Sequence, residues 1–432
     1  MVSSLSSAEP AVLIELRSAR TVGQSRLERI IFFGLLTLLL FGPLAFGAVE
    51  SWAILVQEIV AVGLVMLWIC GWLANPQTQS QPNRLYFPLA ALGVVVLLQL
   101  CLRVPPYLHA TLLAAASGIT YLLIFFLANQ AFKYPQNVRI AARTFLIFGF
   151  VLAIYSTFQA FIAPEKLLGF RLPRIASSPF GPYVNHAHYA GLMELLLPFP
   201  LAMAFRRNLA RSQAAMYGLI ALAMAASVFL SESRGGMIVV VVQFAIVIAL
   251  WLRSTTSVAR RWMIIAAGVL AILVMWLGAG RLQQSLSTFR HPGVSVATRL
   301  QIAKDTVHVA EARPWLGWGL GSFPVVYPEF RSFYSNQVVG EAHNDFLQAL
   351  AELGIVGALV LLWFLIELYR SGLRHLDRWR ADSVSAAKFA ALIAVSGLLL
   401  HGLGDFNFHI PANAALFSAL CAMATVRSDH PA

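Results

Sequence analysis

Residues 30–49, with the sequence IIFFGLLTLLLFGPLAFGAV, form an apolar run without a charged side chain. About 20 apolar residues in a helix cross the hydrocarbon core of a bilayer, because a helix satisfies its own backbone hydrogen bonds there. The run follows Arg17, Arg20, Arg26 and Arg29, is longer than the apolar part of a signal peptide, and has no clear small-residue cleavage site after it. We therefore interpret it as an uncleaved first membrane span.

Similar runs recur along the chain of 432 residues, which is 59% hydrophobic and only 12% charged. Because a soluble domain carries about 25% charged residues, this composition argues against a soluble protein. Spans are expected at about 30–49, 52–73, 86–102, 109–129, 144–163, 187–205, 214–231, 236–252, 262–280, 346–369, 388–404 and 412–426. The predicted fold is an all-α polytopic membrane protein with about 12 transmembrane helices and a partly helical periplasmic loop region.

Lysine and arginine indicate the orientation, because they collect in cytoplasmic loops. Most of the 31 basic residues fall on the side of the N-terminus, so topology explains most of the net charge of +12 and no nucleic acid partner is expected. The predicted organisation is a cytoplasmic segment, nine spans, a large periplasmic loop with an amphipathic helix, three spans and a cytoplasmic tail. Their bounds are 1–29, 30–280, 281–345, 346–426 and 427–432.

The amphipathic helix is predicted from Leu300, Ala303, Val307 and Ala310, which recur at steps of three and four residues. Such a helix would lie on the membrane surface or cap the bundle. Residues 315–321 follow, with three glycines and two tryptophans, and are expected to form a turn with aromatic side chains at the interface. A dinucleotide-binding interpretation of these glycines is discarded, because no strand precedes them.

Arg234 lies in Ser231-Glu232-Ser233-Arg234-Gly235-Gly236, which is expected to form a tight turn between two spans. A charge at the membrane interface is costly unless it is paired or functional. Arginine binds phosphate with two parallel hydrogen bonds, and glycine allows another group to approach closely. The equally supported alternative is a topological or structural arginine, paired for example with Glu232.

His343 lies just before the tenth span, in His343-Asn344-Asp345. Asn344 is a good N-cap, so His343 would lie at the positive end of the helix dipole, which favours the neutral imidazole. A neutral imidazole can accept a proton as a general base. The alternative is an interfacial histidine that only hydrogen-bonds its own loop. Asn344 is also a candidate substrate contact.

Other arginines on the predicted periplasmic side are Arg299, Arg281 and Arg290 in the long loop and Arg171 and Arg174 in a shorter one. Each alone is more often a solvated residue or a lipid-headgroup contact, but together they could hold an anionic substrate.

Three polar residues enter spans from the same side. Asn185 and His186 are expected to hydrogen-bond substrate; His186 and His188 could form a metal pair, but no third ligand is evident, so we predict no metal site. Asp405 is expected to pair with an arginine or to orient His343.

Cations that hold a diphosphate and a histidine that deprotonates a hydroxyl are the groups needed for glycosyl transfer from a lipid diphosphate sugar. Arginines would neutralise the diphosphate, so no cofactor is expected.

The same residues resemble the O-antigen ligase and polymerase superfamily of bacterial envelope enzymes. The resemblance runs through Pro179-Phe180-Gly181, Ser233-Arg234-Gly235-Gly236, Thr298-Arg299 and His343-Asn344-Asp345, and covers about residues 144–426. It implies a metal-independent, inverting, GT-C-like glycosyltransferase of the inner membrane with its site facing the periplasm. The implied donor is a polysaccharide on undecaprenyl diphosphate, and the implied acceptor of a ligase is the lipid A–core oligosaccharide.

By this resemblance, His343 would be the catalytic base, and Arg234 and Arg299 would bind the diphosphate, among membrane lipids. An O-antigen polymerase and a protein O-oligosaccharyltransferase remain alternatives that differ only in the acceptor. A lipid-linked sugar transporter is a distant alternative, favoured by Glu194 inside the sixth span.

Overall fold

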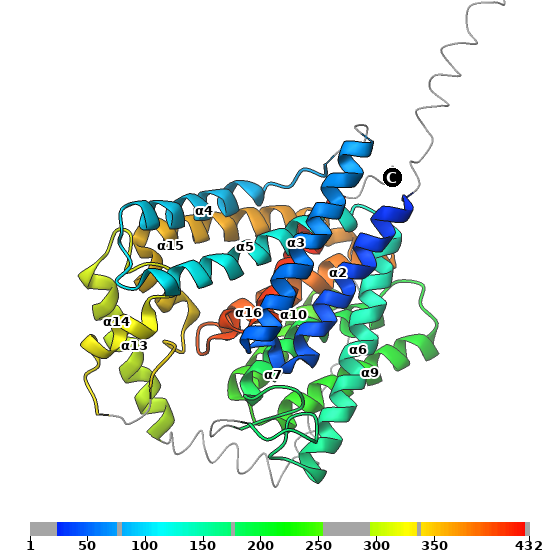
Figure 1. The fold of residues 1–432 in the computed structure, drawn as a ribbon. Helices are drawn as coiled ribbons and strands as arrows, with labels where there is room; N and C mark the ends of the chain where they lie inside the picture. The colour runs from blue at the N-terminus through cyan, green and yellow to red at the C-terminus, as the bar shows by residue number, and fades with distance from the viewer. Residues whose placement is uncertain (1–23, 76–79, 174–177, 254–293, 335–337, 428–432) are drawn as a thin grey trace, which may run out of the picture.

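The computed structural model describes residues 24–75, 80–173, 178–253, 294–334 and 338–427 (Figure 1). Within these ranges the chain forms helices and no β-strand. The helices are α2 Arg26–Leu44, η1 Phe46–Ala48, α3 Ser51–Ala74, α4 Tyr86–Cys101, α5 Leu108–Ala131, α6 Pro135–Ile162, α7 His186–Leu196, α8 Pro198–Ala204, α9 Arg211–Leu230, α10 Arg234–Leu252, α13 Val294–Ala312, α14 Phe323–Phe330, α15 Asp345–Gly372, η2 Leu373–Arg378, α16 Ser383–His401, η3 Asn407–His409 and α17 Pro411–Thr425.

The predicted all-α polytopic membrane class is confirmed. Eight helices of the described ranges are long and apolar enough to cross a membrane: α2, α3, α5, α6, α9, α10, α15 and α16. The shorter apolar helices α4 and α17, and the pair α7–α8, fall on three further predicted spans. The predicted span at 262–280 lies outside the described residues, so the count of twelve stays a prediction, as do the domain bounds.

The centre of the bundle is formed by α7, α8, α16 and α17. Every residue from 187 to 196 of α7 is buried, and most of α16 and α17 is buried as well. Large apolar side chains on the surrounding helices point outward, such as Phe87 of α4, Phe158 of α6 and Leu219 of α9. An apolar outer surface around a bundle whose backbone groups are paired is the arrangement that lipid requires.

The directions of the helices define two ends of the bundle. Helices α7, α10, α15 and α17 begin at one end, where α9 and α16 finish. We call this the site end. The segment containing α13 and α14 packs beside the first half of α15 (Figure 1), so this segment covers the bundle near the site end.

Helix α15 is broken at Gly354, which has a φ of 66° that favours glycine. Residues 314–319 fill the break: the Ile355 amide donates to the Pro314 carbonyl at 2.7 Å, and the Trp318 amide donates to the Ala351 carbonyl at 3.0 Å. A β-carbon at Gly354 would lie 2.3 Å from the Trp315 carbonyl oxygen. Close backbone packing, in addition to turn formation, therefore explains the glycine-rich segment after α13.

The predicted helix at 298–311 is confirmed as α13, but it packs with a different face from the one expected. Leu300 and Val307 are exposed, at 59% and 39%, whereas Ile302 and Val309 are buried against α14 and α15. Of the predicted apolar face, only Ala310 is fully buried. The side of α13 that packs therefore includes polar residues and differs from the predicted apolar positions, and the placement of Leu300 and Val307 at the membrane surface stays a prediction.

Two polar residues on the packed side of α13 are buried with their partners. The Tyr327 hydroxyl and the Ser332 amide each donate to Asp305 Oδ2 at 3.1 Å. The Thr306 hydroxyl donates to the Ile302 carbonyl at 2.6 Å. Because buried polar groups are stable when they are hydrogen-bonded, this face could not be recognised from hydrophobic periodicity alone.

Candidate active site

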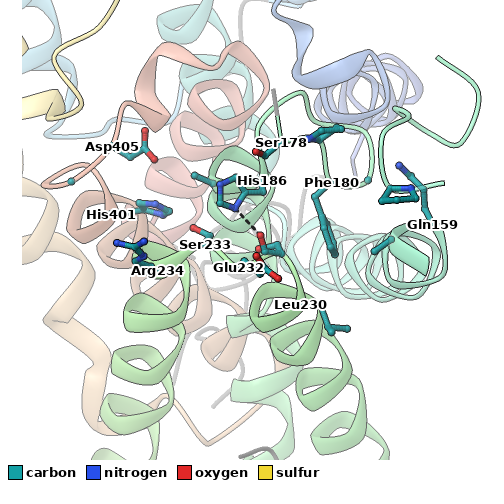
Figure 2. A pocket seen from close by; sticks show the side chains of 18 of the residues that line it. Gln159, Ser178, Phe180, His186, Leu230, Glu232, Ser233, Arg234, His401 and Asp405 are labelled. Atoms are coloured by element: carbon teal, nitrogen blue, oxygen red, sulfur yellow. Dashed lines mark hydrogen bonds between the residues drawn. The ribbon is translucent and has the colours of Figure 1, made fainter. Parts of the chain in front are cut away.

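A cavity of about 780 Å³ lies at the site end. Its lining comes from α6, the segment 178–187, the α9–α10 turn, α13 and the end of α16 with the loop that follows. The lining includes Arg234, Arg299, His186, His401 and Asp405, four of which are labelled in Figure 2. The volume is within the range of small-molecule sites, and two arginines from distant parts of the chain contribute to the lining.

Arg234 is the first residue of α10, so the tight turn predicted for 231–236 ends earlier than expected. The turn is made by Ser231, Glu232 and Ser233, with Glu232 at a φ of 62°. The Gly236 amide donates to the Ser233 hydroxyl at 3.2 Å, which makes Ser233 the N-cap of α10. The cap fixes the start of α10 and thereby the position of Arg234 at the cavity.

The two glycines after Arg234 serve helix packing. A β-carbon at Gly235 would lie 2.6 Å from Nε2 of His401, and one at Gly236 would lie 2.5 Å from Cβ of Ala190. Both positions lie within α10, so close approach of α16 and α7, rather than turn formation, requires glycine here.

Arg299 reaches the cavity from α13. Its Nη1 donates to the Gly404 carbonyl at 3.3 Å. Gly404 precedes Asp405, so this hydrogen bond brings a guanidinium close to the buried carboxylate in the loop after α16. The cation on α13 and the cation on α10 thus line the same cavity.

His343 lies on the other side of Asp405. His343 Nδ1 is 3.7 Å from Asp405 Oδ1, and the imidazole packs edge-on against Phe406 with ring centroids 5.0 Å apart. The backbone of His343 has a φ of 51°, an uncommon conformation for a residue other than glycine. Such strain is held only where the surroundings dictate it, and Asn344 supplies part of that restraint.

Asn344 is the N-cap of α15, as predicted. Its side-chain oxygen accepts from the amides of Phe346 at 3.1 Å and Leu347 at 3.0 Å, and its Nδ2 donates to the Leu403 carbonyl at 2.9 Å. The cap therefore ties the start of α15 to the loop that carries Asp405. Its role as a substrate contact stays a prediction.

Asp405 is 2% exposed and keeps its charge. Burial alone would raise the pKa of Asp405, but the His343 imidazole 3.7 Å away and the neighbouring His188, His401 and Arg299 side chains lower it well below its usual range. A buried carboxylate beside an imidazole can orient the ring and stabilise its protonated form.

A second polar network, formed around His409, packs against the segment that contains His343. His409 Nδ1 is 2.9 Å from Asp345 Oδ1 and its Nε2 is 3.6 Å from Glu341 Oε2. Gln348 Nε2 donates to Glu341 Oε2 at 2.6 Å. Burial opposes the charged imidazole, but the hydrogen bond to Asp345 and the charge of Glu341 outweigh it and raise the pKa of His409 to about 9.

Sequence reasoning missed one pair at the cavity. His401 Nδ1 is 2.7 Å from Glu194 Oε1, and both side chains are buried, at 2% and 0% exposed. Glu194 was the residue that favoured a transporter, because an isolated acid inside a span marks an ion pathway. It is paired with a histidine of the cavity wall, so this argument for a transporter is removed.

The other predicted site residues have different surroundings. The Asn185 side chain accepts from the Ala187 amide at 2.8 Å and caps α7. His186 Nδ1 lies 2.7 Å from the Ser231 carbonyl oxygen and lines the cavity (Figure 2). Arg171 hydrogen-bonds Glu50 and lies 4.5 Å from the centre of the Phe46 ring, away from the cavity lining.

Three predicted contacts, Arg174, Arg281 and Arg290, lie outside the described residues. Within the described ranges, no group of three His, Cys, Asp or Glu side chains is placed to hold a metal ion. The prediction of a metal-independent reaction is therefore tested by chelation, as set out in the Discussion.

Comparison with known proteins gives one finding. A family model described as O-antigen ligase matches residues 219–362, about a third of the chain, from α9 to α15. The matched stretch contains Arg234, Arg299 and His343. This third of the chain is similar to the O-antigen ligase family. No curated protein matches the chain.

The match supports, in general terms, an O-antigen ligase or polymerase type of function for this polytopic membrane protein. Asp405, His186 and His401 lie outside the matched stretch, and the fold brings them to the cavity that Arg234 and Arg299 line.

Proposed function

We propose that this protein is an O-antigen ligase of the bacterial inner membrane. It transfers O-antigen polysaccharide from undecaprenyl diphosphate to the lipid A–core oligosaccharide on the periplasmic side, by inverting transfer without a metal ion. The donor's lipid tail lies against the apolar helices, and its diphosphate enters the cavity at the site end.

Arg234 and Arg299 bind the diphosphate in this proposal. Guanidinium groups form charge-assisted, paired hydrogen bonds with phosphate oxygens. They stabilise the negative charge that grows on the diphosphate as its bond to the sugar breaks. Because they come from α10 and α13, both must be in place before the diphosphate is held from two sides.

His343 takes the proton of an acceptor hydroxyl. The acceptor oxygen then bonds to the anomeric carbon from the face opposite the diphosphate, and the bond between that carbon and the diphosphate oxygen breaks. The electron pair leaves with the diphosphate, and the configuration at the anomeric carbon inverts. Asp405, 3.7 Å from the imidazole, stabilises the imidazolium that forms.

The observation that supports the proposal is that two arginines and Asp405 line one cavity, while His343, which is not among the lining residues, lies next to Asp405. The two arginines are Arg234 and Arg299. The residues come from α10, α13, the start of α15 and the loop after α16, so no local sequence segment accounts for their proximity. Asn185, His186, Asn344, Arg171, Arg174, Arg281 and Arg290 remain proposed substrate contacts.

The test is transfer in vitro by the purified full chain, with labelled lipid diphosphate polysaccharide and lipid A–core. His343→Ala should lower turnover by about 10² or more, because general-base catalysis contributes about 10²–10⁴. His308→Ala is the matched control, since His308 is an exposed histidine on α13 outside the cavity lining. Near-normal turnover of correctly inserted His343→Ala would refute the assignment of the base.

The product identifies the acceptor. A ligase forms labelled lipopolysaccharide and does not lengthen the lipid-linked chain. If the labelled chain grows on the lipid carrier instead, the protein is a polymerase. If only an added protein acceptor is labelled, it is an oligosaccharyltransferase.

A further inference from the structure

The His401–Glu194 pair has no part in the mechanism above. Removing two ionisable groups from water inside a membrane bundle is costly, and such residues are usually functional. Within the described residues, Glu194 Oε2 is buried and has no hydrogen-bond partner, so the carboxylate depends on its 2.7 Å contact with His401. A purely structural role would be met more cheaply by apolar side chains.

His401 is accessible to the occupant of the cavity. It lines the cavity beside Arg234 (Figure 2). The absence of a side chain at Gly235 is what allows this, because a β-carbon there would lie 2.6 Å from Nε2. The imidazole therefore has one nitrogen, Nδ1, on Glu194 and the other close to the backbone that follows Arg234.

Several charges act on His401 from the elements around it. Glu194 of α7, Asp405 of the loop after α16 and Asp345 of α15 place negative charge near the buried imidazole. Arg234 of α10 lines the same wall, and His188 of α7 lies within electrostatic range; positive charge on either opposes protonation. A diphosphate in the cavity adds negative charge to this balance and so favours a proton on the imidazole.

We propose that His401 is a third diphosphate-binding residue of the cavity, and that entry of the diphosphate stabilises its protonated imidazole, which takes up a proton from the solvent to the extent that the ring was neutral before. The protonated ring donates through Nε2 to a diphosphate oxygen and through Nδ1 to Glu194, which acts as a positioning residue. The proton returns to the solvent when the diphosphate leaves. The inference rests on the proposed function for the assignment of the cavity to a diphosphate.

Inorganic pyrophosphate is a suitable probe, because it carries the diphosphate without sugar or lipid. We would titrate it into the purified full chain by calorimetry at pH 7, in two buffers with different enthalpies of ionisation. The buffer dependence of the heat gives the number of protons taken up per pyrophosphate bound. Comparing variants at one pH cancels the protons contributed by pyrophosphate itself.

His401→Asn should bind pyrophosphate about tenfold or more weakly, because a hydrogen bond to a charged group is lost. It should also take up fewer protons than the unchanged protein. Glu194→Gln should lower proton uptake at pH 7 and restore it at more acidic pH, because the amide no longer stabilises the imidazolium. His308→Asn, on the exposed part of α13, should change neither quantity.

Loss of His401 alone leaves Glu194 buried without a partner, which threatens folding. The double variant His401→Asn with Glu194→Gln removes both charges, and such paired removal is often nearly neutral for stability. It should fold, bind weakly and show the reduced proton uptake. If a folded variant without His401 takes up as many protons as the unchanged protein, the inference is wrong.

Failure of the inference and failure of the proposed function give different results. Pyrophosphate binding that depends on Arg234 but not on His401 would overturn the inference and leave the diphosphate site intact. Proton uptake that depends on His401 in a protein that transfers no glycan would support the inference and overturn the ligase proposal. No binding of pyrophosphate to the unchanged protein would overturn the inference.

Discussion

Asp405→Asn separates two roles that the loop after α16 could have in the proposed reaction. The carboxylate either contacts substrate directly or acts through His343, whose Nδ1 is 3.7 Å away. Asparagine has nearly the same shape, and its side-chain oxygen can still accept from the Phe406 amide, as Asp405 Oδ1 does at 2.9 Å. The substitution therefore removes the charge and leaves the local loop geometry in place.

The expected effect follows from the distance. Unit charges 3.7 Å apart attract each other by about 4 kcal/mol at an effective dielectric constant of about 20. The His343 side chain is 26% exposed, so solvent screens part of this and we expect about 2 kcal/mol of lost stabilisation in the transition state. Since 1.36 kcal/mol is a factor of ten, kcat should fall about 30-fold.

The assay is steady-state transfer with varied donor, which separates kcat from KM. If Asp405 acts through His343, kcat falls and the donor KM stays within about twofold, because only the transition state carries the imidazolium. Asp382→Asn is the control: Asp382 caps the other end of α16, where asparagine is an equally good cap. An unchanged kcat with a raised KM would refute the orienting role and favour direct substrate contact.

Gly235→Ala should displace His401 and lower transfer at least tenfold, and overpacking should reduce the stability of the fold by about 1–3 kcal/mol. Gly404→Ala is the control and should not lower transfer, because a β-carbon there meets nothing within 4 Å. Equal activities of the two variants would contradict this prediction. His409 has a pKa raised to about 9 in the folded protein, so its contribution to stability is complete below about pH 6.5 and is lost as the pH rises through 9. The thermal unfolding midpoint should therefore fall between pH 7 and 10 by several degrees more than in His409→Gln, and parallel curves would contradict the assignment. Transfer should persist in EDTA. If EDTA abolishes transfer and added Mg²⁺ restores it, the proposal that arginines alone neutralise the diphosphate is wrong.

The helices and their order were predictable because a bilayer imposes a simple rule on sequence. Each predicted span within the described residues coincides with a helix, since long apolar runs have few other solutions in lipid. Asn344 was identified as a cap for a similar reason: a side chain that satisfies free amides at a helix start acts locally. Features governed by neighbours in sequence were the ones that could be predicted.

Features that depend on tertiary partners were not predictable. The packed face of α13 contains Asp305 and Thr306, whose burial is acceptable only because of partners on other segments. The glycines at 235 and 236 looked like turn residues but accommodate His401 and Ala190. A single sequence contains no signal for such pairs.

The pairing of Glu194 with His401 is the clearest case. The two residues are 207 positions apart in the chain, and each on its own was assigned no part in the active site. Their contact changes the interpretation of Glu194 from an ion-pathway acid to a partner of the cavity wall.

The break in α15 at Gly354 has a consequence for how the protein is assembled. Peptide groups left open by the break would cost several kcal/mol each in hydrocarbon, and residues 314–319 satisfy them. The first turns of α15, which lead from His343, are therefore completed only after residues 314–319 have docked against them. Biogenesis of the site is thus ordered: a chain inserted without its docked loop would span the bilayer and yet be unable to hold its imidazole in place.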